Sequence, residues 1–363
     1  MTTFVTGFPG FLGSALVDRL VGAAPAEADV TCLVQPRYRG LAERRVAAIE
    51  RAHDASGAIA LVDGDIVAPD LGLGDRYASL QARTTVAYHL AAVYDLGVEL
   101  ALGRRVNVRG TQHLLAFVEG AADLDRLHYM STCYVSGRYD GAFGPDDLLV
   151  GQRFNNHYEA TKFQAEVAVR TAMARGLPAT VYRPGIVVGD SETGATRKYD
   201  GPYPFVRLLL RQPGPVAVVP VVGDPRATTL NLVPSDFVLE ALDALRDRPD
   251  AVGETYQLAD PDPPTIEAVV DGLASAIGKR VVQVPVPRAV LRGSLEHVPG
   301  LAALTGVQPE LVDYFDLPTR YDASRTVAAL EAAGVACPSF ESYVDVMVDY
   351  VRTHPTADAG PMV

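Results

Sequence analysis

Short runs of β-branched and apolar residues alternate with longer amphipathic stretches over the first half of the chain. Apolar residues at helical spacing predict helices over 11–22, 41–55 and 104–119. The runs between and after them predict strands over 3–6, 30–34, 58–62, 85–89, 127–131 and 179–183. Strands that alternate with helices are typical of the α/β class. We therefore predict a Rossmann-type, doubly wound parallel sheet that helices cover on both faces.

The alternation ends near residue 190. The stretch 190–225 is rich in Gly, Pro and Tyr, while 231–245 predicts one more helix and 255–259 one more strand. Two or three helical patterns between Pro-rich turns follow. The predicted division is a dinucleotide-binding domain over 1–190 with 226–260 returning to it, a smaller interleaved substrate-binding part over 191–225 and 261–352, and a frayed tail over 353–363.

Composition excludes several classes of function. The 363 residues carry a formal net charge of −12, which argues against nucleic acid as a partner. No apolar run approaches the roughly 18 residues that span a bilayer, and no leader pattern begins the chain. Three widely spaced cysteines and scattered histidines form no metal-ligand pattern. We expect a cytoplasmic protein without a metal. A homodimer is expected only because homodimers are the commonest oligomers of soluble proteins.

A glycine-rich segment follows the first predicted strand and opens the first predicted helix. Gly7 allows a tight turn, Gly10 lets the backbone approach a pyrophosphate, and Gly13 permits close helix–strand packing. The helix N-terminus adds partial positive charge for phosphate. The alternative is a purely structural turn, but the position favours dinucleotide binding. The expected contacts are Gly7, Pro9, Gly10, Phe11, Leu12 and Gly13.

The end of the second predicted strand indicates which dinucleotide the protein binds. A carboxylate there would bind a ribose 2′-hydroxyl, but the chain has Gln35 followed by Arg37 and Arg39. A guanidinium suits a 2′-phosphate, so we predict NADPH over NADH, with Arg37 as the candidate ligand. The alternative is that these arginines are solvated loop charges. Asp65 and Ile66, after the third predicted strand, are expected to contact the adenine. Leu90, Ala91 and Ala92, after the fourth, are expected to form a surface of small residues under the cofactor.

Tyr158 and Lys162 are the strongest catalytic candidates. Only three of the 32 basic residues are lysine, and one lies four positions after a tyrosine. Residues at i and i+4 share a helix face, so the ammonium and the phenol can meet, and the ammonium would lower the Tyr pKa. Asn155 or Asn156 can cap this helix and Gly176 can end it. The alternative is a surface tyrosine beside a solvated lysine.

Together these motifs resemble the extended short-chain dehydrogenase/reductase family, and within it the thioester-reductase-like and fatty-acyl-CoA-reductase-like subgroup. The likeness reaches to about residue 240. Two positions depart from the subgroup, Gln35 where an arginine is expected and Pro145 where an acid is expected. The motifs that carry the resemblance to the family are Thr6-Gly7-x-x-Gly10-x-x-Gly13, Gly64-Asp65-Ile66, His89-Leu90-Ala91-Ala92, Asn107-Val108-Arg109-Gly110-Thr111, Ser131-Thr132, Tyr158-x-x-x-Lys162 and Arg183-Pro184-Gly185. The segments that carry the likeness to the subgroup are 64–73, 131–137, 156–166 and 189–194.

The resemblance implies roles for individual residues. Tyr158 would be the general acid/base, Lys162 would hold the nicotinamide ribose, and Thr132 would hydrogen-bond the reacting oxygen. Ser131 would lie beside Thr132, and Asn107 would support the site. Cys133 is expected to point away into the core. The nicotinamide contacts would be Pro184, Gly185, Ile186 and Val187.

The implied reaction is NADPH-dependent hydride transfer to a carbonyl. The favoured substrate is an acyl thioester, bound to coenzyme A or to a carrier, reduced to aldehyde or alcohol. Three alternatives stay open: an aldehyde or ketone reductase, a nucleotide-sugar epimerase or dehydratase that recycles NAD, and a redox-sensing regulator without catalysis. Segments 285–287 and 291–307 either wall an acyl pocket or pack the small part.

Overall fold

The fold is known from a computed structural model that describes residues 2–300 and 307–355. Its centre is a seven-stranded sheet with parallel pairing throughout and the order β11-β7-β5-β4-β1-β2-β3. The predicted α/β Rossmann-type class is confirmed. Each predicted strand run lies within about a residue of an observed strand. The strands are β1 (Thr2–Thr6), β2 (Val30–Val34), β3 (Ile59–Asp63), β4 (Thr84–His89), β5 (Arg126–Met130), β7 (Ala179–Pro184) and β11 (Thr255–Leu258).

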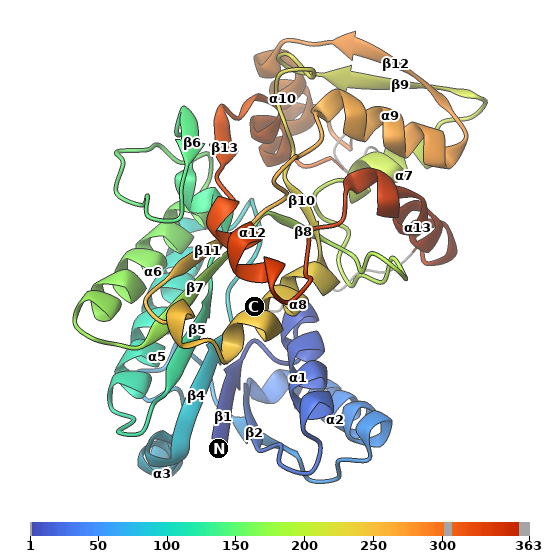
Figure 1. The fold of residues 1–363 in the computed structure, drawn as a ribbon. Helices are drawn as coiled ribbons and strands as arrows, with labels where there is room; N and C mark the ends of the chain where they lie inside the picture. The colour runs from blue at the N-terminus through green and yellow to red at the C-terminus, as the bar shows by residue number, and fades with distance from the viewer. Residues whose placement is uncertain (1, 301–306, 356–363) are drawn as a thin grey trace.

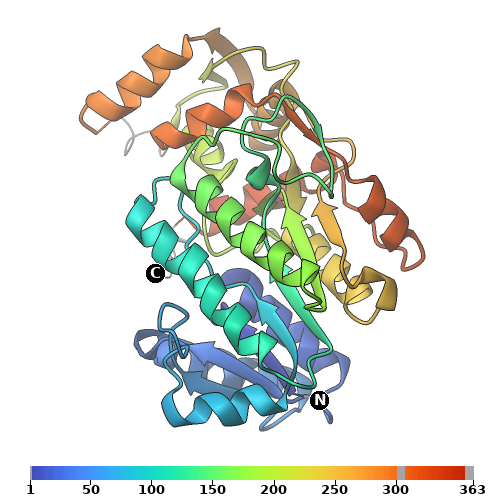
Figure 2. The ribbon, with the colours of Figure 1, turned by 90° about the vertical axis from the view of Figure 1, so that its left-hand side faces the viewer.

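Helices cover both faces of this sheet (Figures 1 and 2). One face packs against α1 (Phe11–Ala23), α2 (Arg39–His53), α8 (Ser235–Arg246) and α12 (Ser324–Glu331). The other packs against α3 (Tyr77–Arg83), α5 (Gly110–Glu119) and α6 (His157–Ala174). A sheet buried on both faces explains why its strands are almost continuously apolar.

A second apolar core lies beyond the carboxyl ends of the strands (Figure 1). Three small two-stranded parallel sheets belong to this side of the molecule, formed by β8 with β10, β9 with β12, and β6 with β13. The helices of this core are α7 (Tyr203–Arg211), α9 (Ile266–Ile277), α10 (Arg288–His297), η6 (Pro309–Asp316) and α13 (Phe340–Thr353). The strands are β6 (Gly141–Phe143), β8 (Ile186–Val188), β9 (Val216–Val221), β10 (Leu232–Pro234), β12 (Arg280–Pro285) and β13 (Thr319–Tyr321).

Two predicted elements differ from the structure. The predicted helix over 231–245 begins as strand β10, and α8 starts only after Pro234, because proline suits a helix boundary better than its interior. The predicted helix over 104–119 consists of a π-helical segment η3 (Arg104–Arg109) followed by α5, and the short helix α4 (Leu100–Gly103) lies directly before it. Of the predicted tail, 356–363 lie outside the described residues.

No helix in the described ranges is long and apolar enough to cross a bilayer.

Candidate active site

Thr132 and Tyr158 lie together at the carboxyl edge of the sheet. Thr132 follows β5 and caps the short helix η4 (Cys133–Ser136), where its hydroxyl accepts a hydrogen bond from the Tyr134 amide at 3.3 Å. Tyr158 stands in the first turn of α6, which Asn156 caps through its side chain. Both residues are buried. The predicted cap of the tyrosine helix is therefore the second of the two asparagines.

Lys162 lies one turn further along α6 and is also buried. Its ammonium donates to the carbonyl oxygen of Met130 at 2.8 Å and to the Tyr129 hydroxyl at 3.3 Å. Burial lowers the pKa of Lys162 to about 8, although the carboxylate of Glu166 acts in the opposite direction. These two hydrogen bonds hold the lysine ammonium against the carboxyl end of β5, two residues before Thr132.

The prediction that Lys162 lowers the pKa of Tyr158 is wrong for this structure. Burial raises the pKa of the Tyr158 phenol above its ordinary value, and the Thr132 side chain opposes that shift only in part. The physical reason is geometric, since the ammonium is directed to β5. Removal from water is therefore the dominant influence on the phenol.

A buried ion pair supports the strand ends behind these residues. Glu166 and Arg183 are fully buried and lie 2.5 Å apart. The Ser131 hydroxyl donates to the second oxygen of Glu166 at 2.5 Å. Arg183 also donates to the Asp147 carbonyl oxygen at 2.8 Å, which ties the loop before α6 to β7. This network fixes the position of Ser131 beside Thr132.

A large cavity of about 560 Å³ runs along the carboxyl edge of the sheet. The glycine-rich segment lines it on one side, and Tyr158 and Lys162 lie on another. A Cβ on Gly10 or Gly13 would come within 2.6 or 2.4 Å of the Gly7 carbonyl oxygen, so only glycine fits there. Such a cradle fits a dinucleotide pyrophosphate. Predicted residues that line the cavity are Gly7, Pro9, Gly10, Phe11, Leu12, Gly13, Asp65, Ile66, Leu90, Ala91, Ala92, Ser131, Thr132, Pro184, Gly185, Ile186 and Val187.

Arg37 does not line this cavity. Its guanidinium donates to the Gln35 side chain at 2.6 and 2.8 Å and lies over the Tyr38 ring. Arg45, one turn and a half into α2, does line the cavity and donates to the Ser14 hydroxyl at 2.8 Å. Sequence reasoning missed Arg45 because it considered only the strand end, and not the helix that follows.

A segment from the second core closes the cavity from the opposite side. Thr196, Arg197, Lys198 and Asp200 line it. One terminal nitrogen of Arg197 is buried without a hydrogen-bond partner among the described residues. An orphaned guanidinium N–H on a residue that lines the dinucleotide cavity fits an anionic ligand. No sequence pattern marked Arg197, because its placement depends on packing between distant segments.

Asn107 supports the site without lining the cavity. It accepts from the Val93 amide at 2.9 Å and donates to the Thr161 hydroxyl at 3.1 Å. Its carbonyl oxygen accepts from Thr111, whose hydroxyl also lies 3.0 Å from His89. These contacts connect η3, α6 and the loop after β4.

Cys133 lies in the core, as expected, but for a different reason. It belongs to η4 and not to the strand, and its thiol donates to the Arg183 carbonyl oxygen at 2.9 Å. Burial raises its pKa, which keeps the thiol protonated and unreactive.

The Rossmann sheet, the glycine cradle and the Thr–Tyr–Lys set together define an NAD(P)-dependent oxidoreductase of the extended short-chain type. The chain belongs to a family of NAD-binding proteins described as male sterility protein, whose model matches residues 5–242. It falls in the thioester-reductase-like branch of that family.

Relatives with curated descriptions include peptide synthetases and reductases that are much longer than this chain. The chain is 29% identical over 269 residues to a linear gramicidin synthase of Brevibacillus parabrevis, covering 71% of the chain and 5% of that protein. It is 28% identical over 365 residues to the isonitrile lipopeptide synthase of Streptomyces coeruleorubidus, covering 93% and 23%. The L-2-aminoadipate reductase large subunit of Penicillium chrysogenum is 29% identical, with 69% and 19% covered. The chain thus spans less than a quarter of each of these proteins.

Solved structures agree on the fold. The terminal R domain from the myxalamid PKS-NRPS pathway has a TM-score of 0.81 at 26% identity, covering 99% of this chain and 92% of that one. A thiolation-reductase di-domain from an archaeal non-ribosomal peptide synthetase has a TM-score of 0.75 at 19% identity, with 98% and 76% covered. A UDP-glucuronic acid 4-epimerase from Bacillus cereus has a TM-score of 0.68 at 20% identity, with 99% covered in both chains.

Proposed function

We propose that this protein is an NADPH-dependent reductase of acyl thioesters. One observation carries the proposal: the dinucleotide-sized cavity and an apolar cavity share Tyr158 as a lining residue. The carbonyl carbon of a substrate in the apolar cavity would therefore lie beside the catalytic phenol. The likeness to the terminal R domain and to the synthetase relatives supports a thioester substrate.

The bound dinucleotide would supply a hydride to the thioester carbonyl carbon. The Thr132 and Tyr158 hydroxyls would hold the developing oxyanion, and the Tyr158 phenol would protonate it. The raised pKa of Tyr158 keeps the phenol protonated, as proton donation requires. The resulting hemithioacetal then collapses to an aldehyde and a thiol. Lys162, which α6 carries and β5 holds through Met130 and Tyr129, would orient the ribose.

An arginine in the cavity favours NADPH over NADH. The residue after β2 is the neutral Gln35, whose amide donates to the Asp65 carboxylate at 3.0 Å. Arg45 lines the same cavity and donates to Ser14 in α1, and its guanidinium would suit a 2′-phosphate.

The test is NADPH oxidation by the purified protein with acyl-CoA thioesters and the matching free aldehydes, with NADH in parallel. We expect turnover of thioesters, and a decrease of about 10²–10⁴-fold in kcat/KM for Tyr158→Phe with dinucleotide affinity retained. Turnover of aldehydes alone would identify a simple carbonyl reductase. Unchanged turnover in Tyr158→Phe would refute the catalytic assignment.

A further inference from the structure

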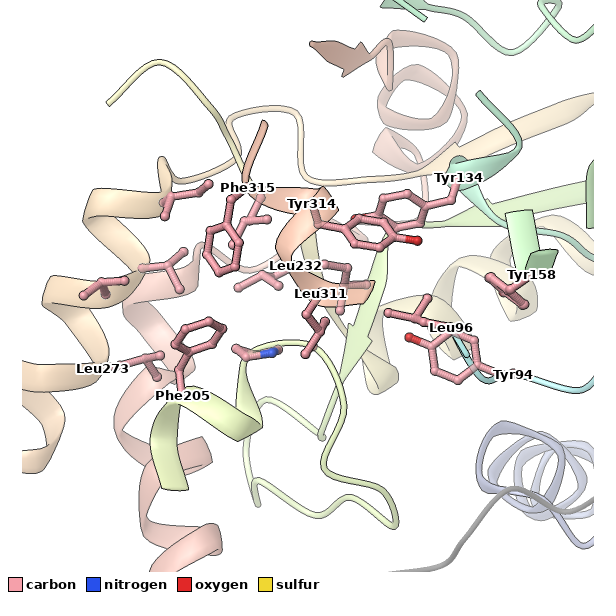
Figure 3. Close-up of a pocket in the computed structure, with 17 residues that line it drawn as sticks. Tyr94, Leu96, Tyr134, Tyr158, Phe205, Leu232, Leu273, Leu311, Tyr314 and Phe315 are labelled. Carbon is pink, nitrogen blue, oxygen red and sulfur yellow. The ribbon is translucent and has the colours of Figure 1, made fainter. Parts of the chain in front are cut away.

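The second cavity begins at Tyr158 and extends away from the sheet (Figure 3). Tyr94, Tyr134 and Tyr158 stand at one end, and Phe205 and Leu273 at the other. Four residues line both this cavity and the dinucleotide cavity, namely Tyr94, Tyr134, Tyr158 and Ile186. The two spaces therefore meet at the catalytic tyrosine.

The cavity wall is apolar and carries no charged side chain. Helix α9 contributes Ile266, Val269, Val270 and Leu273, and other segments add Leu230, Leu232 and Leu311. Hydroxyl groups belong to tyrosines at the Tyr158 end. Of these, Tyr314 donates its hydroxyl to Glu159 at 2.8 Å, so that its polar atom is already bonded outside the cavity. The Leu273 end offers hydrocarbon only.

The η6 segment forms one wall of the cavity and is held from two sides. Tyr314 bonds Glu159 in α6, and the buried Asp313 pairs with Arg288 and Arg292 of α10. Phe205 and Phe315 both line the cavity and contact each other edge to face, with ring centroids 5.4 Å apart. The volume is about 60 Å³ although the cavity spans from Tyr158 to Leu273. A cavity of such small volume that extends from Tyr158 to Leu273 is narrow, and a narrow cavity favours an unbranched chain over a branched one.

We propose that this cavity takes the acyl group of the substrate, and that the acyl group is an unbranched, uncharged hydrocarbon chain whose end reaches Leu273. This rests on the proposed function, because it places the carbonyl carbon at Tyr158. A charged end group would be left without a partner in the apolar wall. The predicted acyl walls at 285–287 and 291–307 are not among the lining residues, and 301–306 lie outside the described residues.

The kinetic test compares saturated acyl thioesters of increasing length, together with analogues that carry a terminal carboxylate or ammonium. We expect kcat/KM to rise by about fourfold per methylene up to an optimum, and to fall by at least about 100-fold for the charged analogues. Leu273→Ala should move the optimum to longer chains and Leu273→Phe to shorter ones. Ile277→Ala, a truncation on the same helix outside the cavity, should leave the optimum unchanged.

A binding experiment separates the cavity from the reaction. Titration of unbranched alcohols from butanol to decanol by calorimetry, in the presence of NADP⁺, should show affinity that rises with length and a dependence on Leu273 but not on Ile277. Val270→Ile adds one methyl group to the same wall and replaces Leu273→Phe if that variant does not fold. Length-dependent binding without thioester turnover would refute the reaction and keep the cavity assignment. If neither kcat/KM nor the binding affinity depended on chain length and terminal charge, the inference would be overturned.

Discussion

Two arginines that follow β2, Arg37 and Arg45, are expected to affect cofactor choice differently. Arg45 lines the dinucleotide cavity, whereas Arg37 is bonded to Gln35 and stacked on Tyr38. We expect Arg45→Ala to weaken NADPH binding by about 10–100-fold, the value of a charge-assisted hydrogen bond, and to leave NADH binding unchanged. Fluorescence titration of both dinucleotides measures this. Arg37→Ala is the matched control, and a loss of NADPH affinity in that variant would instead support the strand-end prediction.

The buried ammonium of Lys162 makes stability depend on pH. The pKa of Lys162 is about 8 in the folded protein, whereas the unfolded chain has the ordinary lysine value of 10.5. Between these values the unfolded chain holds a proton that the folded protein has released, so the free energy of unfolding rises with pH. The rise is on the order of 3 kcal/mol over the window.

Urea denaturation at pH 7 and pH 10.5 tests this for the wild type and for Lys162→Met. Because the variant has no titrating group there, its free energy of unfolding should be higher relative to the wild type at pH 7 than at pH 10.5. An equal difference at both pH values would contradict the assigned shift.

At the scale of elements, the Glu166–Arg183 pair joins α6, β5 and β7. Glu166→Gln would leave Arg183 charged and buried without its counter-ion, and we expect a loss of about 3–5 kcal/mol in the free energy of unfolding. Chemical denaturation measures the loss. The exposed pair of Glu119 and Arg175 is the control, since Glu119→Gln should cost less than about 1 kcal/mol. Equal losses would mean that burial does not set the strength of the pair.

The elements around the candidate catalytic residues were largely predictable from the sequence. Strands buried on both faces read as apolar runs, and Tyr158, Lys162 and Glu166 recur at the spacing of one helix face. What lay beyond prediction depends on contacts between distant segments. The orphaned nitrogen of Arg197 and the apolar wall shared by α9 and η6 have no local signature. Local pattern also misjudged 231–234, where a short strand precedes α8.

At the scale of the whole molecule, the dinucleotide cavity joins the two apolar cores. The glycine-rich segment belongs to the sheet, while Thr196–Asp200 precede α7 of the second core. A dinucleotide that contacts both should stabilise them together, by about 2.7 kcal/mol at a concentration of 100 times Kd.

Hydrogen exchange with and without NADPH tests this coupling. We expect amide protection to increase in both the glycine-rich segment and residues 196–200. Arg197→Ala should abolish the increase at 196–200 and retain it at the glycines. Protection confined to the glycine-rich segment in the wild type would show that the second core does not bind the cofactor.

The scarcity of lysine would have a chemical consequence if the protein releases an aldehyde, as the proposed function requires. Neutral amines condense with aldehydes to Schiff bases, and a catalyst with many free lysines would be modified by its own product. Here all three lysine ammonium groups are bonded: Lys162 to Met130, Lys198 to Tyr94 and Asp200, and Lys279 to Leu209 and Gln212. Arginine carries the remaining positive charge and stays protonated, so it does not condense in this way. In the proposed reaction, the preference for arginine would therefore leave few side chains that the aldehyde product could modify.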